Sequence, residues 1–229
     1  KNVWSADADQ NYTIYFVIEF NKDIKKFGGW HDHTLWETDT MTARYPQRFG
    51  CYAEFDTTDY PEVMVRSGIS YVDMAGASNN LSNEITEPFG WNFEAVHKHQ
   101  SDSWNNILNR VRIYSNDYRE KARFYTNLYR AFCRNTFSDA DRRWVDAAGN
   151  IQKLDDPDAV ALGCDAFWNT FWNLNQVWNL IAPEWSSRWV RSQLAMYDAN
   201  GWLAKGPSGM KYIPVMVAEH EIPLLVSTY

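Results

Sequence analysis

A glutamate and a histidine lie side by side near the end of the chain. Glu219 and His220 stand within the otherwise apolar run VMVAEHEIPLL. Burying such a pair costs free energy unless it is hydrogen-bonded or faces a ligand, so the pair is the best polar candidate for a binding site. Alternatively, the pair caps its own helix or faces solvent, with Glu221 as the solvent-facing partner.

Histidines with metal-ligand character occur at two places, and neither pattern predicts a metal site. His31-Asp32-His33 places ligand-type residues at alternate positions, but the tripeptide follows Gly28-Gly29 and is expected in a loop. His97 and His99 lack the i, i+4 spacing that a helical metal pair needs, and we expect both to be solvated.

Acidic residues gather in an oxygen-rich stretch that could attract calcium. This stretch lacks the ligand spacing and the glycine turn of an EF-hand, so a solvated loop is expected. Its members are Asp139, Asp141, Asp155, Asp156 and Asp158.

Cysteine usage predicts neither a disulfide framework nor a CxxC metal knuckle. Cys51, Cys133 and Cys164 are widely spaced and odd in number. We expect three buried thiols.

Composition favours a carbohydrate ligand. The chain has 229 residues, of which 16% are aromatic, more than a core needs and typical of surfaces that stack on the flat faces of sugars or nucleobases. The net charge of -7 argues against nucleic acid, because phosphate neutralisation requires clustered Lys and Arg. No apolar run reaches the ~18 to 20 residues of a membrane span.

The first third of the chain is predicted to be β-structure. Residues 12–20, 49–55 and 62–72 are short, aromatic and β-branched, with turn residues between them. This pattern indicates a sandwich, but so few strands cannot close two packed sheets. We therefore expect that part of this domain lies on the N-terminal side of the chain.

Helical periodicity follows. A stripe that starts at Asn92 predicts one helix, and Asp117 followed by Glu120 resembles a capping box that opens a second. Residues 138–158 are polar and predict a long loop or a small hairpin.

The last part of the chain is predicted to be helical. A third helix is expected over 166–181, and a fourth begins at Pro183 and ends at Asn200-Gly201. A final helix is expected over 215–227, kinked at Pro223. A succession of helices joined by short connections is typical of a helical toroid.

Several stretches, in this order, resemble glycoside hydrolase family 92, a family of calcium-dependent exo-α-mannosidases. They cover essentially the whole chain: YFVIEFNKDIKKFGGW at 15–30, VRSGISYVDMAGASNNLSNEI at 65–85, WNNILNRVRI, FYTNLYRAF followed by FSDAD, FWNTF at 167–171, GWL at 201–203 and MVAEHEIPLL.

The resemblance implies a mixed fold with α and β in separate domains. Residues 1–85 would form the C-terminal part of a β-sandwich, 86–115 a linking helix region, and 116–229 the first helices of an (α/α)6 barrel that forms the catalytic domain. The remainder of the polypeptide would be needed to complete the fold, and residues 1–229 alone are not expected to fold as a stable monomer.

The resemblance also implies hydrolysis of terminal α-linked mannose in glycans, with inversion and with the aid of calcium. The catalytic acid and base have no counterpart in this chain, so we name neither, and the calcium ligands are expected mostly outside it. An extracytoplasmic location, periplasmic or at the cell surface, is implied in the same way.

The family's sugar-binding wall is similar to two segments here. A Trp-Asp-Thr triplet of the family corresponds to Trp168-Asn169-Thr170, while Glu219 and His220 match a position that approaches the terminal sugar. A carboxamide both donates and accepts, so Asn169 suits a differently presented set of hydroxyls than Asp would. The family's Arg three positions later is Trp172 here.

Alternatives stay open at this point. FWNTFW could be an aromatic core helix, and the altered wall could redirect the enzyme to another sugar or leaving group. The chain could also belong to a non-catalytic carbohydrate-binding protein. Trp30 and Trp36, on a sandwich loop, could stack on the leaving sugar.

Overall fold

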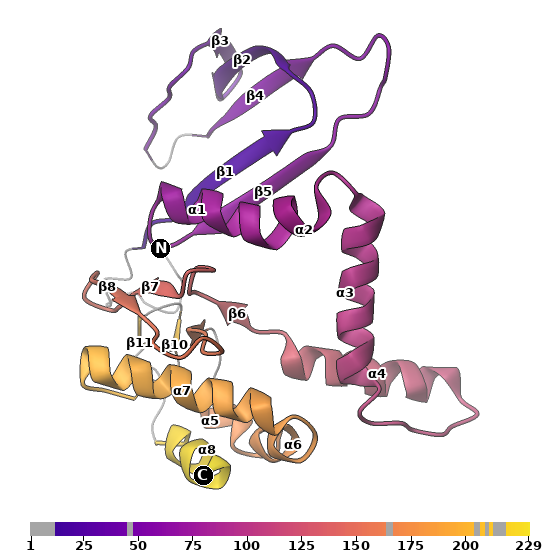
Figure 1. The fold of residues 1–229 in the computed structure, drawn as a ribbon, viewed down its shortest axis with the longest axis vertical. Helices are drawn as coiled ribbons and strands as arrows, with labels where there is room; N and C mark the ends of the chain where they lie inside the picture. The colour runs from indigo at the N-terminus through magenta and orange to yellow at the C-terminus, as the bar shows by residue number, and fades with distance from the viewer. Residues whose placement is uncertain (1–11, 45–47, 164–166, 204–206, 209–210, 213–218) are drawn as a thin grey trace. The chain divides into compact units, whose positions relative to one another are not determined.

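The fold is mixed, with strands first along the chain and mainly helices afterwards, with short strands between them (Figure 1). The computed structural model describes residues 12–44, 48–163, 167–203, 207–208, 211–212 and 219–229. The chain divides into two compact units, one formed by Val17–Ser67 and the other by the segment that ends at Phe16 together with Gly68–Tyr229. The predicted succession of a β region and a helical region is confirmed.

The N-terminal strands form two small sheets. One pairs β1 (Tyr15–Phe20) with β5 (Val65–Ser70), and the other has the order β3 (Thr34–Glu37), β2 (Ile24–His31), β4 (Phe49–Phe55). The three predicted strands are confirmed as β1, β4 and β5. The sequence did not predict β2 and β3.

The glycine pair in β2 was wrongly taken as the entry to a loop. A Cβ on Gly28 would lie 2.3 Å from the carbonyl oxygen of Trp36, so tight cross-strand packing rather than a turn requires this glycine. The turn comes later, where Asp32 adopts a φ of 51°. Trp30 and Trp36 accordingly lie on paired strands and not on a loop.

A helical segment that the sequence did not predict follows β5. It consists of α1 (Met74–Leu81), the π-helical turn η1 (Ser82–Thr86) and the short α2 (Glu87–Phe89). Its Gly-, Ser- and Asn-rich sequence lacks a clear apolar stripe. Asp73 caps α1 by accepting a hydrogen bond from the Gly76 amide at 2.6 Å. A Cβ on Gly68 would lie 2.4 Å from the Ala77 carbonyl oxygen, so this glycine lets α1 approach the strand closely.

The next two helices, α3 (Phe93–Leu108) and α4 (Tyr118–Phe132), confirm the predicted pair. Asp117 is the N-cap of α4, but it accepts from the Arg119 amide at 2.7 Å. Ser115 Oγ donates to Glu120 at 2.7 Å and accepts from the Asp117 amide at 3.0 Å. In place of the predicted reciprocal capping box between Asp117 and Glu120, Ser115 links the Glu120 carboxylate to the Asp117 amide.

The polar stretch 138–158 contains the small hairpin, formed by β7 (Arg143–Val145) and β8 (Ile151–Lys153). Two short strands beside it, β6 (Asn135–Thr136) and β9 (Leu162–Gly163), also pair. The expectation of a fully solvated acidic loop is wrong for Asp139, which is 5% exposed. Ser70 Oγ and Asn80 Nδ2 each donate to its carboxylate at 2.8 Å, and these bonds offset its burial.

The C-terminal helices are α5 (Phe167–Thr170), α6 (Leu174–Ile181), α7 (Pro183–Asn200) and α8 (Glu221–Thr228), with a short hairpin of β10 (Pro207–Ser208) and β11 (Lys211–Tyr212). The predicted single helix over 166–181 is wrong because Asn173, with a φ of -159°, interrupts it. The boundaries of α7 are confirmed: Pro183 opens the helix, and Gly201 closes it with a φ of 76°.

The final helix starts later than expected. Because α8 begins at Glu221, Pro223 lies in its first turn, where a missing N–H costs no intrahelical hydrogen bond. The predicted kink at Pro223 is therefore wrong. Residues 213–218, where the helix was expected to begin, lie outside the described part of the chain.

The helical core is aromatic. Helices α6 and α8 pack against α7 (Figure 1), and Phe167, Trp178, Trp189 and Leu224 are fully buried in the core that these helices form with α5. The expectation of buried thiols is wrong for Cys51 and Cys133, which are exposed. Cys133 follows the last buried residue of α4, where the chain leaves the core; Cys164 lies outside the described residues.

Candidate functional site

The short helix α5 separates a buried face from an exposed one. Phe167 and Thr170, three positions apart, lie on the same side and are 0% and 4% exposed. The Phe167 ring meets Trp189 edge to face, with the ring centroids 5.1 Å apart. Asn169 falls between them on the exposed side. FWNTFW is thus core on one face only, and the side chain of Trp168 lies outside the described part.

The turn after α5 carries two further aromatic rings. The Phe171 amide donates to the Phe167 carbonyl at 3.3 Å, and the Trp172 amide donates to the Asn169 carbonyl at 3.2 Å. These backbone bonds hold the turn beside Asn169. Phe171 is 37% exposed and Trp172 is 74% exposed, so the alternative in which FWNTFW is an aromatic core helix is wrong for these two residues.

A ring stack joins this turn to the start of α8. The His220 imidazole lies over Phe171 with centroids 4.4 Å apart and planes inclined by 20°. His220 is half-buried and is the N-cap residue of α8, while Glu219 before it is exposed. The structure therefore brings His220 next to the segment that carries Asn169, although the two are far apart in the sequence.

The carboxylate buried in this region is Glu221, which is 4% exposed. The alternative in which Glu221 faces solvent is wrong. Because α8 begins at Glu221, this residue and Leu224 are three positions apart on the face that packs inward. The spacing of Glu221 and Leu224 was the available sequence signal, but it could be used only once the helix start was known.

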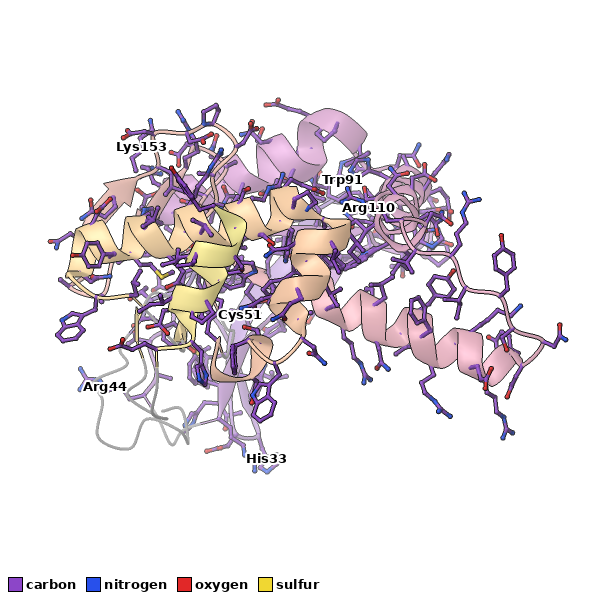
Figure 2. All side chains as sticks on the ribbon, turned by 90° about the horizontal axis from the view of Figure 1, so that it is seen from below. His33, Arg44, Cys51, Trp91, Arg110 and Lys153 are labelled. Carbon is purple, nitrogen blue, oxygen red and sulfur yellow. The ribbon has the colours of Figure 1, made fainter. Side chains whose placement is uncertain are left out.

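The helices beneath the site are held by bonds from the preceding segments. Trp178 Nε1 donates to the Ala131 carbonyl of α4 at 2.9 Å, and its ring stacks on Trp189 at 6.1 Å. Arg110 (Figure 2) donates to the Ile181 carbonyl at 3.1 Å and pairs with Glu184. These contacts fix the start of α7.

Arg110 also lowers the pKa of Glu184. Burial by itself would raise the pKa of Glu184, but the hydrogen bond and positive charge of Arg110 outweigh it and leave that pKa below its ordinary value. Glu184 also stands in the first turn of α7, where a negative charge is favoured by the helix dipole.

A second polar cluster joins α1 to the β7–β8 hairpin. Arg143 donates to Asp73 at 2.7 Å and to Asp141 at 2.6 Å. The hydrogen bond from Arg143 is the main reason why the pKa of Asp73 lies below its ordinary value. Asp139 lies 3.9 Å from the same guanidinium, and its carboxylate also accepts from Ser70 and Asn80. These bonds give the cluster a structural role.

Metal ligands do not gather in the described residues. Within those ranges, no group of three or more His, Cys, Asp or Glu side chains could hold a metal ion. His33 (Figure 2) is exposed at the turn between β2 and β3, and His31 Nδ1 lies 3.6 Å from the Asp32 carboxylate. His97 and His99 are exposed, as expected; His97 stacks on Phe93, and the His99 ring is tilted by 52° against Phe89.

None of the helices in the described residues is both long enough and apolar enough to cross a bilayer.

An exposed carboxamide, an exposed carboxylate and a half-buried imidazole near aromatic rings can bind a polyhydroxylated ligand. The polar groups can exchange hydrogen bonds with hydroxyls, and the rings can pack against apolar C–H faces. The model of the glycosyl hydrolase family 92 catalytic domain matches residues 76–229, and that of the family 92 N-terminal domain matches 1–70. This chain belongs to glycosyl hydrolase family 92.

Solved family 92 structures share the fold. The inverting mannosidase BT2199 from Bacteroides thetaiotaomicron VPI-5482 is similar to 96% of this chain, with a TM-score of 0.79 and 21% identity. The α-mannosidase BT3965 from Bacteroides thetaiotaomicron is similar to 93%, with a TM-score of 0.77 and 23% identity. In complex with mannoimidazole, BT3965 gives a TM-score of 0.76 at 24% identity over 93% of this chain.

The match covers only part of each family 92 relative. The chain spans 29% of the length of BT2199, 29% of BT3965 and 28% of BT3965 in its complex. No curated protein matches the chain.

Proposed function

We propose that the protein containing this family 92 chain removes terminal α-linked mannose from glycans, with inversion at the anomeric carbon. Family membership supports a glycosidase. BT2199 is described as an inverting mannosidase, and BT3965 as an α-mannosidase whose structure contains mannoimidazole. The observation that carries the proposal is the Phe171–His220 stack, which joins the two segments that resemble the family's sugar-binding wall.

In this proposal Trp168, Asn169, Glu219 and His220 bind the terminal sugar. Asn169 and Glu219 are exposed and can reach hydroxyl groups, while the ring of Phe171 holds the His220 imidazole. Asn169 can accept one hydroxyl proton and donate to another hydroxyl oxygen. These residues bind and orient the sugar; we name no general acid or general base among the described residues.

Inversion requires two carboxyl groups on opposite sides of the scissile bond. They stand ~6.5 to 9.5 Å apart, so that a water molecule fits between the base and the anomeric carbon. We propose that both belong to the part of the protein outside this chain. The contribution of this chain is to hold the sugar while those groups act.

The proposed architecture follows the family. Residues 1–85 would belong to a β-sandwich, 86–115 to linking helices and 116–229 to an (α/α)6 barrel. The consecutive helices α6 and α7, joined through Ala182, suit a barrel built from helical hairpins. An extracytoplasmic location, periplasmic or at the cell surface, is part of the same proposal.

Calcium is proposed as the metal, held mainly by residues outside this chain. The described residues do not supply a complete ligand set. Removing calcium from the intact protein with EDTA should abolish mannoside hydrolysis, and adding calcium chloride should restore it. Activity that survives extensive chelation would rule out the calcium requirement.

The substrate proposal is tested with a panel of aryl α-glycosides and the intact protein. Release from the α-mannoside, with the β-anomer of mannose as the first product by NMR, is the expected result. Release from another α-glycoside without release from the mannoside would favour the second candidate, a hydrolase redirected to another sugar or leaving group. Asn169 and Trp172 are the residues that favour this candidate.

A third candidate is a carbohydrate-binding protein without turnover. It predicts that the intact protein binds mannosides, with an affinity measurable by calorimetry, and releases no product from any member of the panel. This outcome is distinct from that of a redirected enzyme, which would turn over at least one glycoside.

A further inference from the structure

Trp172 presents a large aromatic surface to solvent beside the proposed sugar site. Its side chain is 74% exposed, whereas Trp178 and Trp189 of the following helices are fully buried. Within the part of the protein that the structure describes, the indole is open to solvent, and a large exposed aromatic surface often marks an interaction site.

The position of Trp172 is set by its neighbours. Its amide donates to the Asn169 carbonyl at 3.2 Å, so the indole and the carboxamide project from one turn. Its ring meets Phe171 at a centroid distance of 6.3 Å and an angle of 60°, and Phe171 stacks on His220 at 4.4 Å. The three rings form a series that runs from exposed to half-buried beside two hydrogen-bonding groups.

This arrangement suits a pyranose ring better than a purely apolar partner. A sugar has one face lined by C–H groups, which packs against an aromatic ring, and a rim of hydroxyls, which requires donors and acceptors. An apolar protein segment would offer no hydrogen-bond partners to Asn169 and Glu219. Covering these two exposed side chains would then cost desolvation free energy.

We propose that Trp172 is a platform on which a sugar ring of the glycan stacks, adjacent to the ring that Asn169 binds. The ligand is an α-linked manno-oligosaccharide of two or more units, and Trp172 acts as a specificity-determining residue for the sugar beyond the terminal one. This inference rests on the proposed function, because it assumes that Asn169 binds the terminal sugar.

Three variants of the intact protein test the platform, with Trp202 as a matched control. Trp202 is 76% exposed, so Trp202→Ala removes the same side chain from an equally exposed position. Trp172→Ala should weaken binding of an α-mannotriose by roughly three- to tenfold, and Trp172→Phe should retain most of the affinity. Trp172→Arg should bind the α-mannotriose as weakly as Trp172→Ala does. Trp202→Ala should bind it as tightly as the unsubstituted protein does.

Two measurements separate stacking from a purely structural role. In ligand-observed NMR, the C–H protons of one sugar ring should show saturation transfer in the unsubstituted protein and lose it selectively in Trp172→Ala. In kinetics on the same trisaccharide, KM should rise while kcat stays constant, because a platform binds the ground state and the transition state alike.

The outcomes also distinguish this proposal from the substrate assignment. Mannoside hydrolysis with unchanged trisaccharide affinity in Trp172→Ala would overturn the platform and leave the function standing. If the protein acts on another glycoside, the same variants on an oligosaccharide of that sugar decide the platform separately. A lower melting temperature with unchanged affinity would show that Trp172 packs against another part of the protein, which also overturns the proposal.

Discussion

Replacing Asp139 with alanine tests whether its buried carboxylate joins two segments of the chain through hydrogen bonds. This carboxylate accepts from Ser70 Oγ and from Asn80 Nδ2, each at 2.8 Å, and lies 3.9 Å from the Arg143 guanidinium. Asn80 Oδ1 in turn accepts from the Ala140 amide at 2.7 Å. Asp139 therefore connects the β5–α1 segment to the β6–β7 segment.

The cost of the substitution follows from which partners lose their last bond. Asn80 Nδ2 still donates to the Ile69 carbonyl at 2.8 Å, and Arg143 keeps its bonds to two other aspartates, Asp73 and Asp141. The buried Ser70 hydroxyl loses its acceptor, and so does the second Nδ2–H of Asn80; a buried donor left without an acceptor costs about 1–3 kcal/mol, less where water can replace the carboxylate. We expect a loss of about 2 kcal/mol for Asp139→Ala and about half of that for Asp139→Asn, which keeps one acceptor.

Hydrogen exchange in the intact protein measures this loss locally. A loss of about 2 kcal/mol corresponds to roughly thirtyfold faster exchange in peptides that cover α1 and the β6–β7 segment. Asp158→Ala is the control, because Asp158 is an exposed member of the same acidic stretch and should change exchange little. Equal exchange in the Asp139→Ala and Asp158→Ala variants would refute the buried network.

Three further predictions concern pH, the end of α7 and the sugar site. Because the Arg143 bond lowers the pKa of Asp73, the stability it contributes is present above the ordinary carboxyl range and is lost as pH falls through the lowered pKa. Asp73→Asn should flatten the acid limb of the melting temperature against pH; an unchanged limb would contradict this assignment. Gly201→Ala should cost about 1 kcal/mol of unfolding free energy in urea, because φ is 76°, and Gly201→Asn should cost less. Asn169→Asp should lower kcat/KM for an aryl α-mannoside about fivefold, since a carboxylate cannot donate to the hydroxyl oxygen that the carboxamide reaches; an increase would show that Asn169 only accepts from the sugar.

Local patterns predicted much of the secondary structure. Helices α3, α4 and α7 carry apolar stripes and terminal signals such as Asp117, Pro183 and Gly201, all of which act within a few residues. The strand β2 was missed because Gly28 serves close approach to the neighbouring strand, although a glycine pair locally indicates a turn. The helix α1 was missed because its sequence lacks an apolar stripe, and its close packing depends on Gly68 of β5. That requirement depends on packing and is not visible in the local pattern.

The candidate site was predicted in its residue types but not in its burial. The sequence drew attention to Glu219 and His220 because charged residues interrupt an apolar run. It could not tell which glutamate is buried, because this depends on where α8 begins. A helix that starts at Glu221 turns that residue inward and leaves Glu219 exposed.

By itself the sequence determined the family of this chain, the order of its β and helical regions, and the chemical character of its site. These properties rest on residue types, motif order and local propensity. Only the tertiary structure decided that Asp139 and Glu221 are buried, and that Phe171 and His220 stack. Burial and stacking depend on contacts between segments far apart in the chain, and those contacts exist only once the helices have packed.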